Sequence, residues 1–120
     1  RDFVSVHDIV TANLAVMKSK QADYQVFNVG SGSSISITDL GGAILSVMNT
    51  KLQLKITNDY RKGDIRHCFS DIHKIKKMVG WQPMVNFQAG MKELVEWSEK
   101  ERSNDLFEGA QKILKLKGVI

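Results

Sequence analysis

The sequence predicts an α/β fold that consists mostly of helices with a few short strands. Apolar residues recur at helical spacing in several segments, as at positions 9, 12, 15 and 16. Residues 51–57 instead alternate polar and apolar side chains, which is the period-two pattern of a half-buried strand. With 120 residues, the chain can form at most one domain with a modest core.

The first half of the chain predicts two helices and one strand. Asp8 is the expected N-cap of a helix that runs to about Lys18. Residues 25–29 are expected to form a short strand that ends at the Gly30 turn. Thr38 is the expected N-cap of a helix through residue 48. Gly41-Gly42 costs this helix about 1 kcal/mol per glycine, so we expect close packing there.

The second half predicts a strand over residues 52–56 and three further helices. Asp71 is the expected cap of a short helix that Gly80 terminates. Asn86 precedes a long amphipathic helix, and Asp105 begins a last helix that ends near Gly118. The large apolar side chains expected in the core of this half are Trp81, Met91, Leu94, Val95 and Trp97.

Composition is that of an ordinary globular protein, with 42% hydrophobic and 25% charged residues. No apolar run approaches the roughly 18 residues that a membrane span requires. The single cysteine, Cys68, fits a reducing cytoplasm, where we expect the protein to reside. The net charge of +4 includes lysine-rich runs at 74–77 and 112–117, which leaves a nucleic-acid-binding module as an alternative, although no aromatic residues are interleaved with them. A non-catalytic interaction domain is a second alternative.

Residues 60–66 contain the most informative chemistry of the chain. Arg61 can donate a forked pair of hydrogen bonds to phosphate oxygens, and Asp64 can accept two from vicinal hydroxyls. Gly63 between them allows a turn that directs both side chains to one pocket. The segment therefore suits a nucleoside diphosphate, and the alternative is a surface turn with solvated charges.

Four segments in a fixed order, residues 1–10, 27–32, 61–71 and 74–97, together resemble one family. They are similar to the C-terminal part of the extended short-chain dehydrogenases/reductases, the NAD-dependent nucleotide-sugar epimerases and dehydratases of the UDP-glucose 4-epimerase type. The resemblance implies that residues 1–120 are a single C-terminal, substrate-binding fragment that is incomplete without its Rossmann domain. It also implies that residues 8–30 pack on that missing domain.

The resemblance assigns roles to individual residues. Arg1 and Arg61 match arginines near the substrate diphosphate, and Asp64 matches the residue that binds the nucleoside ribose. Lys62 stands where many relatives have proline, which makes the turn less rigid. Asp2 and Asp8 are expected to bind backbone groups or to cap helices.

Other functional groups of the family have no counterpart in this sequence. The family's Gly-x-x-Gly-x-x-Gly turn and Tyr-x-x-x-Lys pair do not occur, so no catalytic or cofactor-binding residue is predicted, and NAD is expected on the missing domain. Residues 30–32 are interpreted as a tight connection, with phosphate contact as the minor alternative. No metal site is predicted, because the spacing of His67, Cys68, Asp71 and His73 does not resemble a ligand set.

The predicted function is nucleotide-sugar recognition within a 4-epimerase, most simply of the UDP-glucose/galactose type. A 4,6-dehydratase and a dTDP-L-rhamnose 4-epimerase are the alternatives in the same family. The fragment alone is expected to be inactive. Its expected partners are a nucleoside-diphosphate sugar and the Rossmann domain, a homodimer is one assembly that the resemblance allows, and no membrane is expected.

Overall fold

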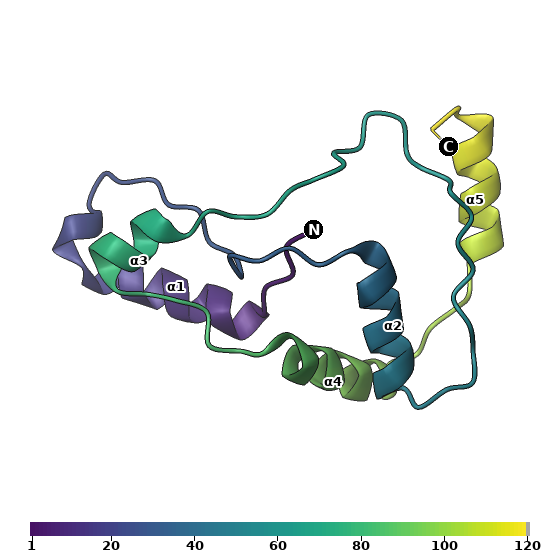
Figure 1. Cartoon of the computed structure of the whole chain (residues 1–120), viewed down its shortest axis with the longest axis horizontal. Helices are drawn as coiled ribbons and strands as arrows, with labels where there is room; N and C mark the ends of the chain where they lie inside the picture. The colour runs from purple at the N-terminus through teal and green to yellow at the C-terminus, as the bar shows by residue number, and fades with distance from the viewer. Residues whose placement is uncertain (120) are drawn as a thin grey trace.

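Five α-helices and one 3-10 helix account for the regular structure of residues 1–119, which are the residues that the computed structural model describes. Figure 1 shows α1 and α3 at one end of an elongated molecule and α5 at the other. Within residues 1–119, no helix has both the length and the apolar character needed to cross a membrane. In chain order the elements are α1 (Val6–Lys18), η1 (Lys20–Ala22), α2 (Ile37–Val47), α3 (His73–Val79), α4 (Phe87–Ser98) and α5 (Phe107–Leu116).

The first two helices begin earlier than the sequence predicts. Ser5, not Asp8, caps α1, because its Oγ accepts a hydrogen bond from the His7 amide at 3.2 Å. Ser36, not Thr38, caps α2, where its Oγ accepts from the Asp39 amide at 3.0 Å. Serine and aspartate have similar capping preferences, so the tertiary contacts of each candidate decide which one caps.

The later helix boundaries lie close to the prediction, although the N-cap positions of α3 and α5 are Ile72 and Leu106, one residue after the predicted Asp71 and Asp105. Asp71 accepts a hydrogen bond from the His73 amide at 2.9 Å, and Gly80 ends α3 in the left-handed conformation with φ of 76°. Asn86 caps α4 by accepting from the Gln88 amide at 2.8 Å. Asp105 accepts from the first amide of α5 at 2.9 Å. These contacts join residues only a few positions apart, so the sequence alone can predict them.

The helical part of the predicted fold class is confirmed, but the two short strands are not formed. Residues 25–29 and 52–56 have no regular secondary structure within the described chain. Every residue from 51 to 69 is exposed, including the apolar Leu52, Leu54 and Ile56. A strand needs a neighbour that pairs with its backbone groups, and within residues 1–119 neither segment is paired in this way.

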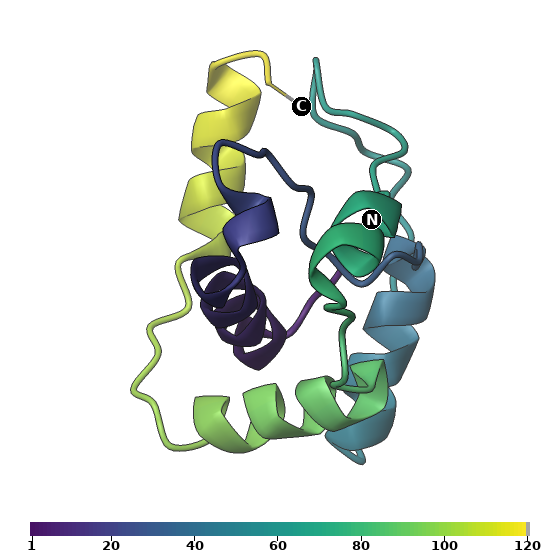
Figure 2. The same cartoon turned by 90° about the vertical axis from the view of Figure 1, so that its left-hand side faces the viewer.

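A small core joins α1 to α3, which lie side by side with η1 in Figures 1 and 2. Its centre is Ala12, Ile75 and Trp81, with Trp81 6% exposed. The Trp81 indole N–H donates to Thr11 Oγ1 at 3.0 Å, which satisfies its polar atom. The prediction for Trp81 is confirmed. The prediction for Trp97 is wrong, because that side chain is 58% exposed while its neighbour Val95 is buried.

The predicted packing of the Gly41-Gly42 pair is half confirmed. A Cβ on Gly41 would lie 2.7 Å from a terminal methyl of Leu54, so this glycine marks a close contact between α2 and that side chain. A Cβ on Gly42 would meet no atom within 4 Å. Nothing in the structure explains the second glycine.

Two aspartates connect the four segments that the sequence singles out. Asp8 is 2% exposed and accepts from the amides of Met84 and Val85 at 2.9 and 3.0 Å, which ties α1 to the segment before α4. Asp2 accepts from the amides of Ser31 and Ser70, both at 2.9 Å. The prediction that both carboxylates bind backbone groups is confirmed.

The chain is less compact than an independent domain of its length. Its radius of gyration is 17.8 Å, and its extents are 50 × 34 × 24 Å. A compact domain of this length would have a radius of gyration of about 14 Å. The long exposed segment from residue 51 to 69 and the distant α5 account for the difference (Figure 1).

Candidate functional site

A hollow of about 610 Å³ lies where the N-terminal residues, the start of α2 and the segment before α3 meet. It brings together all three predicted site residues, which are up to 63 positions apart in the sequence. Its lining residues are Arg1, Ser34, Ile35, Ser36, Ile37, Asn58, Tyr60, Arg61, Asp64, Ile65, Arg66 and His67.

Arg61 and Asp64 are the first and last residues of one tight turn. The Asp64 amide donates to the Arg61 carbonyl oxygen at 3.1 Å, and Gly63 has φ of +82° at the third position. A positive φ at this position is what a type II turn requires, and glycine adopts it without strain. The turn expected from the sequence is therefore present, and it places both side chains on the hollow.

Arg1 closes the hollow from the opposite side. The backbone amino nitrogen of Arg1 donates to the Ile35 carbonyl oxygen at 2.7 Å, and the Arg1 carbonyl oxygen accepts from the Ile35 amide at 2.8 Å. The guanidinium contacts Asp64 Oδ1 at 2.7 Å and also donates to the Ile65 carbonyl oxygen. Arg1 therefore holds Asp64 in place, a contact that the sequence did not predict.

The hollow carries an excess of positive charge. Arg1, Arg61 and Arg66 line it against the single carboxylate of Asp64. Arg1 and Asp64 pair with each other, whereas the Arg61 and Arg66 side chains are exposed. Such a site can hold an anionic group of several oxygens beside a group with hydroxyls, because guanidinium forks suit phosphate and carboxylate oxygens accept from hydroxyls.

Sequence reasoning missed several residues of the hollow. Tyr60 and His67 line it from either side of the turn, and Ser36 with Ile37 bring the N-terminal end of α2 to its wall. Tyr60 and His67 could have been predicted from the sequence, because they are adjacent to Arg61 and Arg66. The contribution of α2 could not be predicted from the sequence, because it depends on the pairing of Arg1 with Ile35, 34 positions away.

The Gly30–Gly32 connection is filled by the chain itself and does not fit a dinucleotide phosphate. A Cβ on Gly30 would lie 2.4 Å from Asp2 Oδ2 and 2.5 Å from Ser70 Oγ. Burial raises the pKa of Asp2, but hydrogen bonds from Ser31 and Ser70 outweigh it, so the pKa lies below its usual value. The ionised Asp2 carboxylate accepts the hydrogen bond of the Ser31 amide, so this amide is not available to a phosphate. The predicted interpretation as a tight connection is confirmed.

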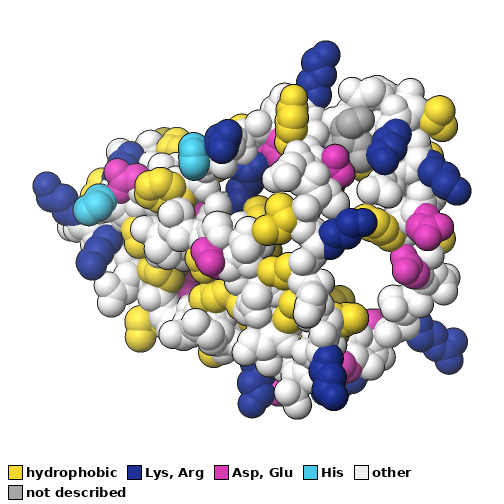
Figure 3. Space-filling model, turned by 45° about the vertical axis from the view of Figure 1, so that its right-hand side comes forward, with side chains coloured by type: hydrophobic (Ala, Val, Ile, Leu, Met, Phe, Trp, Pro, Cys, Tyr) yellow, Lys and Arg dark blue, Asp and Glu magenta, His cyan; other side chains and the backbone are white. Residues whose placement is uncertain are grey.

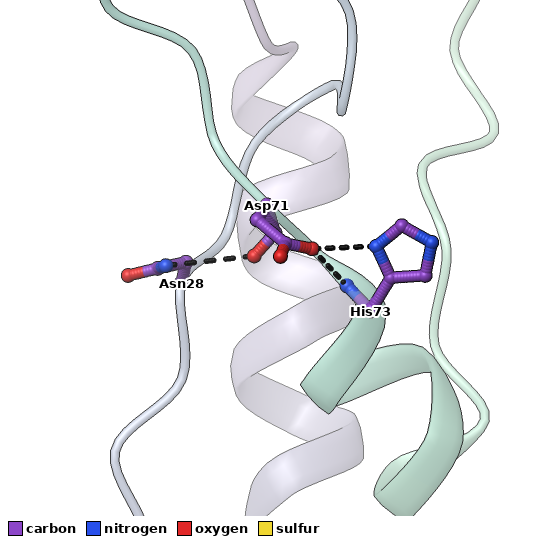
Figure 4. A network of polar contacts seen from close by, with 3 residues as sticks. All are labelled: Asn28, Asp71 and His73. Carbon is purple, nitrogen blue, oxygen red and sulfur yellow. Dashed lines mark hydrogen bonds and ion pairs between the residues drawn. The ribbon is translucent and has the colours of Figure 1, made fainter.

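Asp71 and His73 form a local pair at the start of α3, shown in Figure 4. Asp71 Oδ1 lies 2.6 Å from His73 Nδ1, and the hydrogen bonds from the His73 amide and ring lower the pKa of Asp71. The Asp71 carbonyl oxygen accepts from Asn28 at 3.5 Å. Among residues 1–119, no group of three histidine, cysteine or acidic side chains is arranged to hold a metal ion.

A second, apolar hollow of about 420 Å³ lies between the start of α1 and α4. Phe3, Phe87 and Trp97 are among its lining residues. At its edge, His7 Nε2 lies 2.7 Å from Glu93 Oε1, and this contact raises the pKa of His7. Among the described residues, no arginine lines this apolar hollow, so it lacks the pairing of arginine with carboxylate that is found in the charged hollow.

Basic side chains are scattered over the surface. Figure 3 shows lysine and arginine on separate parts of the face that it displays. That face does not present the continuous basic stripe that a duplex-binding module uses.

Known proteins match most of the chain. Residues 1–94 match the family model described as GDP-mannose 4,6 dehydratase. The chain is 30% identical over 101 residues to a dTDP-L-rhamnose 4-epimerase of Burkholderia thailandensis, covering 84% of this chain and 28% of that protein. It is 29% identical over 102 residues to a UDP-glucose 4-epimerase of Pasteurella multocida, covering 83% and 30%.

A solved structure is similar over the same region. The UDP-glucose 4-epimerase of Thermotoga maritima, solved with UDP-glucose, superposes with a TM-score of 0.76 at 34% identity, covering 83% of this chain and 31% of that one. An enzyme of Bordetella bronchiseptica, solved with NAD⁺ and UDP, shares the fold at 22% identity and a TM-score of 0.67, covering 82% of this chain and 29% of that one. The chain thus spans about 30% of the length of the proteins that it matches.

Proposed function

Because this chain belongs to the NAD-dependent nucleotide-sugar epimerase/dehydratase family, we propose that its charged hollow binds the nucleoside diphosphate part of a nucleotide sugar. The observation that carries the proposal is the placement of Arg61 and Asp64 on one turn, facing Arg1 across the hollow. Arg61 would bind the diphosphate together with Arg1, and Asp64 would accept from the ribose hydroxyls.

Each group would act by position and charge. The guanidinium of Arg61 is exposed, so an incoming phosphate can reach it. Arg1 contacts Asp64 through one arm and the Ile65 carbonyl oxygen through the other, so it would meet the phosphates that flank the ribose by exchanging the second contact. Binding the diphosphate and ribose, which lie away from the reacting carbon, supplies binding energy while the sugar remains free to rotate.

The reaction belongs to the whole protein. The family is enzymatic, and we propose a 4-epimerase of UDP-glucose/galactose, with a dTDP-L-rhamnose 4-epimerase or a dehydratase as the alternatives. The 120 residues contain no Tyr-x-x-x-Lys pair and no free dinucleotide loop, so we expect no turnover from them alone. NAD would bind to the part of the protein that these residues do not include.

A ligand series tests the proposed site. UDP is expected to bind the chain about 100-fold more tightly than uridine and about tenfold more tightly than UMP, because each phosphate adds charge-assisted hydrogen bonds. Isothermal titration calorimetry at two salt concentrations measures the constants, and dTDP in the same series reports base preference. Equal affinity for uridine and UDP would contradict a diphosphate site.

We further propose that α1 packs on the missing remainder of the protein. Its inner face, with Ala12, is buried in the core of the chain. Its outer face carries four apolar side chains at helical spacing, and all four are exposed: Val6, Val10, Leu14 and Met17. A helix that is apolar on two opposite faces needs a partner on each, and the matched relatives are about three times as long as this chain.

Cysteine labelling tests this packing. In a Cys68→Ser background, Val10→Cys is expected to react readily with a maleimide in the 120-residue chain and at least tenfold more slowly in the full-length protein, because burial excludes the reagent. Leu116→Cys on α5 is the matched control, with an exposed apolar side chain on a different helix. Equal labelling of Val10→Cys in both proteins would place the remainder elsewhere.

A further inference from the structure

The turn that carries Arg61 and Asp64 is held by polar contacts and not by packed side chains. All residues from 51 to 69 are exposed, so no packed side chain fixes the turn. The Asp64 amide bond closes it from within. Besides the ion pair between Arg1 and Asp64, a second contact reaches the turn from a distant element: the Lys62 amide donates to the Val119 carbonyl oxygen at 2.8 Å.

The C-terminal end of α5 places the Val119 carbonyl. The Val119 amide donates to the Leu114 carbonyl oxygen and the Gly118 amide to that of Lys115, both at 3.0 Å, and Gly118 has φ of +64°. These two bonds and the left-handed glycine form a Schellman motif. The helix end therefore has a defined shape and presents the Val119 carbonyl oxygen to the turn.

One partner of this contact, Val119, lies outside the region that the family model matches. That match ends at residue 94, whereas α5 begins at Phe107. The contact also depends on the residue at position 62, because a proline there would have no N–H to donate. A proline would instead fix the second turn residue at the φ that a type II turn prefers.

We propose that α5 positions the nucleotide-binding turn through the hydrogen bond between Lys62 and Val119. Lys62 and Val119 are positioning residues, because they act through Arg61 and Asp64. The proposal rests on the proposed function for its effect on ligand affinity, but its effect on the turn can be measured without ligand.

A double-mutant cycle on the 120-residue chain tests the proposal. Position 62 is changed to alanine, which keeps the N–H, or to proline, which removes it. Each is combined with Gly118→Val. Valine disfavours the left-handed conformation of residue 118 at the end of α5, and the substitution leaves the chain length unchanged. Hydrogen exchange of the Asp64 amide reports the turn, calorimetry with UDP reports the site, and thermal melting reports global stability.

In the Lys62→Ala background, Gly118→Val is expected to speed Asp64 exchange and to weaken UDP binding roughly fivefold to tenfold, the worth of one hydrogen bond. In the Lys62→Pro background, neither quantity should change by more than about twofold. Melting should be alike with and without Gly118→Val. An equal response in both backgrounds, or none with Lys62→Ala, would overturn the proposal. Absence of UDP binding in every variant would contradict the proposed function, while exchange would still decide the role of α5.

Discussion

Replacing Asp8 with alanine is expected to lower the free energy of unfolding by about 3 to 5 kcal/mol. The carboxylate is 2% exposed, and two backbone amides of the segment before α4 depend on it. Removing it leaves the Met84 and Val85 amides without this acceptor and creates a cavity beside α1. The core is small, so this loss takes most of the stability that such a chain can have.

Urea unfolding followed by circular dichroism measures this loss. Asp8→Asn retains an oxygen acceptor in the same volume and should cost less than Asp8→Ala. Asp59→Ala is the matched control, because Asp59 is exposed, and its effect should remain within about 0.5 kcal/mol. If Asp8→Ala and Asp59→Ala had the same stability, the carboxylate would not be what joins the two segments.

Arg61→Ala is expected to weaken UDP binding by about 30- to 100-fold without changing the melting temperature. The guanidinium is exposed and its removal takes away no packing, so the loss should fall on the ligand alone. Arg61→Lys keeps the charge but not the planar fork, and we expect it to recover only part of the affinity. Calorimetry with UDP measures each constant.

Arg66→Ala is the matched control for this substitution. Arg66 lines the same hollow and is equally exposed, but it lies beyond the turn that Arg61 begins. We expect its loss to cost less than fivefold, through long-range charge alone. If Arg66→Ala proved the more damaging of the two, the phosphates would lie on the other side of Asp64, and the assignment of Arg61 would be wrong.

The helix caps illustrate what can be predicted locally. Asn86 and Gly80 have the predicted roles, and Asp105 binds the first amide of α5 from one residue before its N-cap, because each acts within three residues of its own position. Asp8 is as good a cap by type as Ser5, yet it faces the segment before α4 instead. Its role depends on a contact 76 residues away, which no local pattern contains.

The strands failed for a related reason. Alternating side chains at residues 51–57 describe a surface that would suit a sheet, but a strand also needs a neighbour. No neighbouring strand lies within residues 1–119, so the pattern remains in an exposed, irregular segment. Trp97 is similar, because its apolar character predicts burial while its place on α4 leaves it exposed.

By itself, the sequence determined the helical segments, the Arg61–Asp64 turn and the family, because these depend on local spacing and on short motifs. Only the tertiary structure decided that Asp2 and Asp8 join the four motifs, that Arg1 pairs with Asp64, and that α5 reaches Lys62. Each of these contacts joins residues far apart in the chain. Which residues meet in these contacts depends on how the segments pack in space, and this packing cannot be predicted from residue type and spacing.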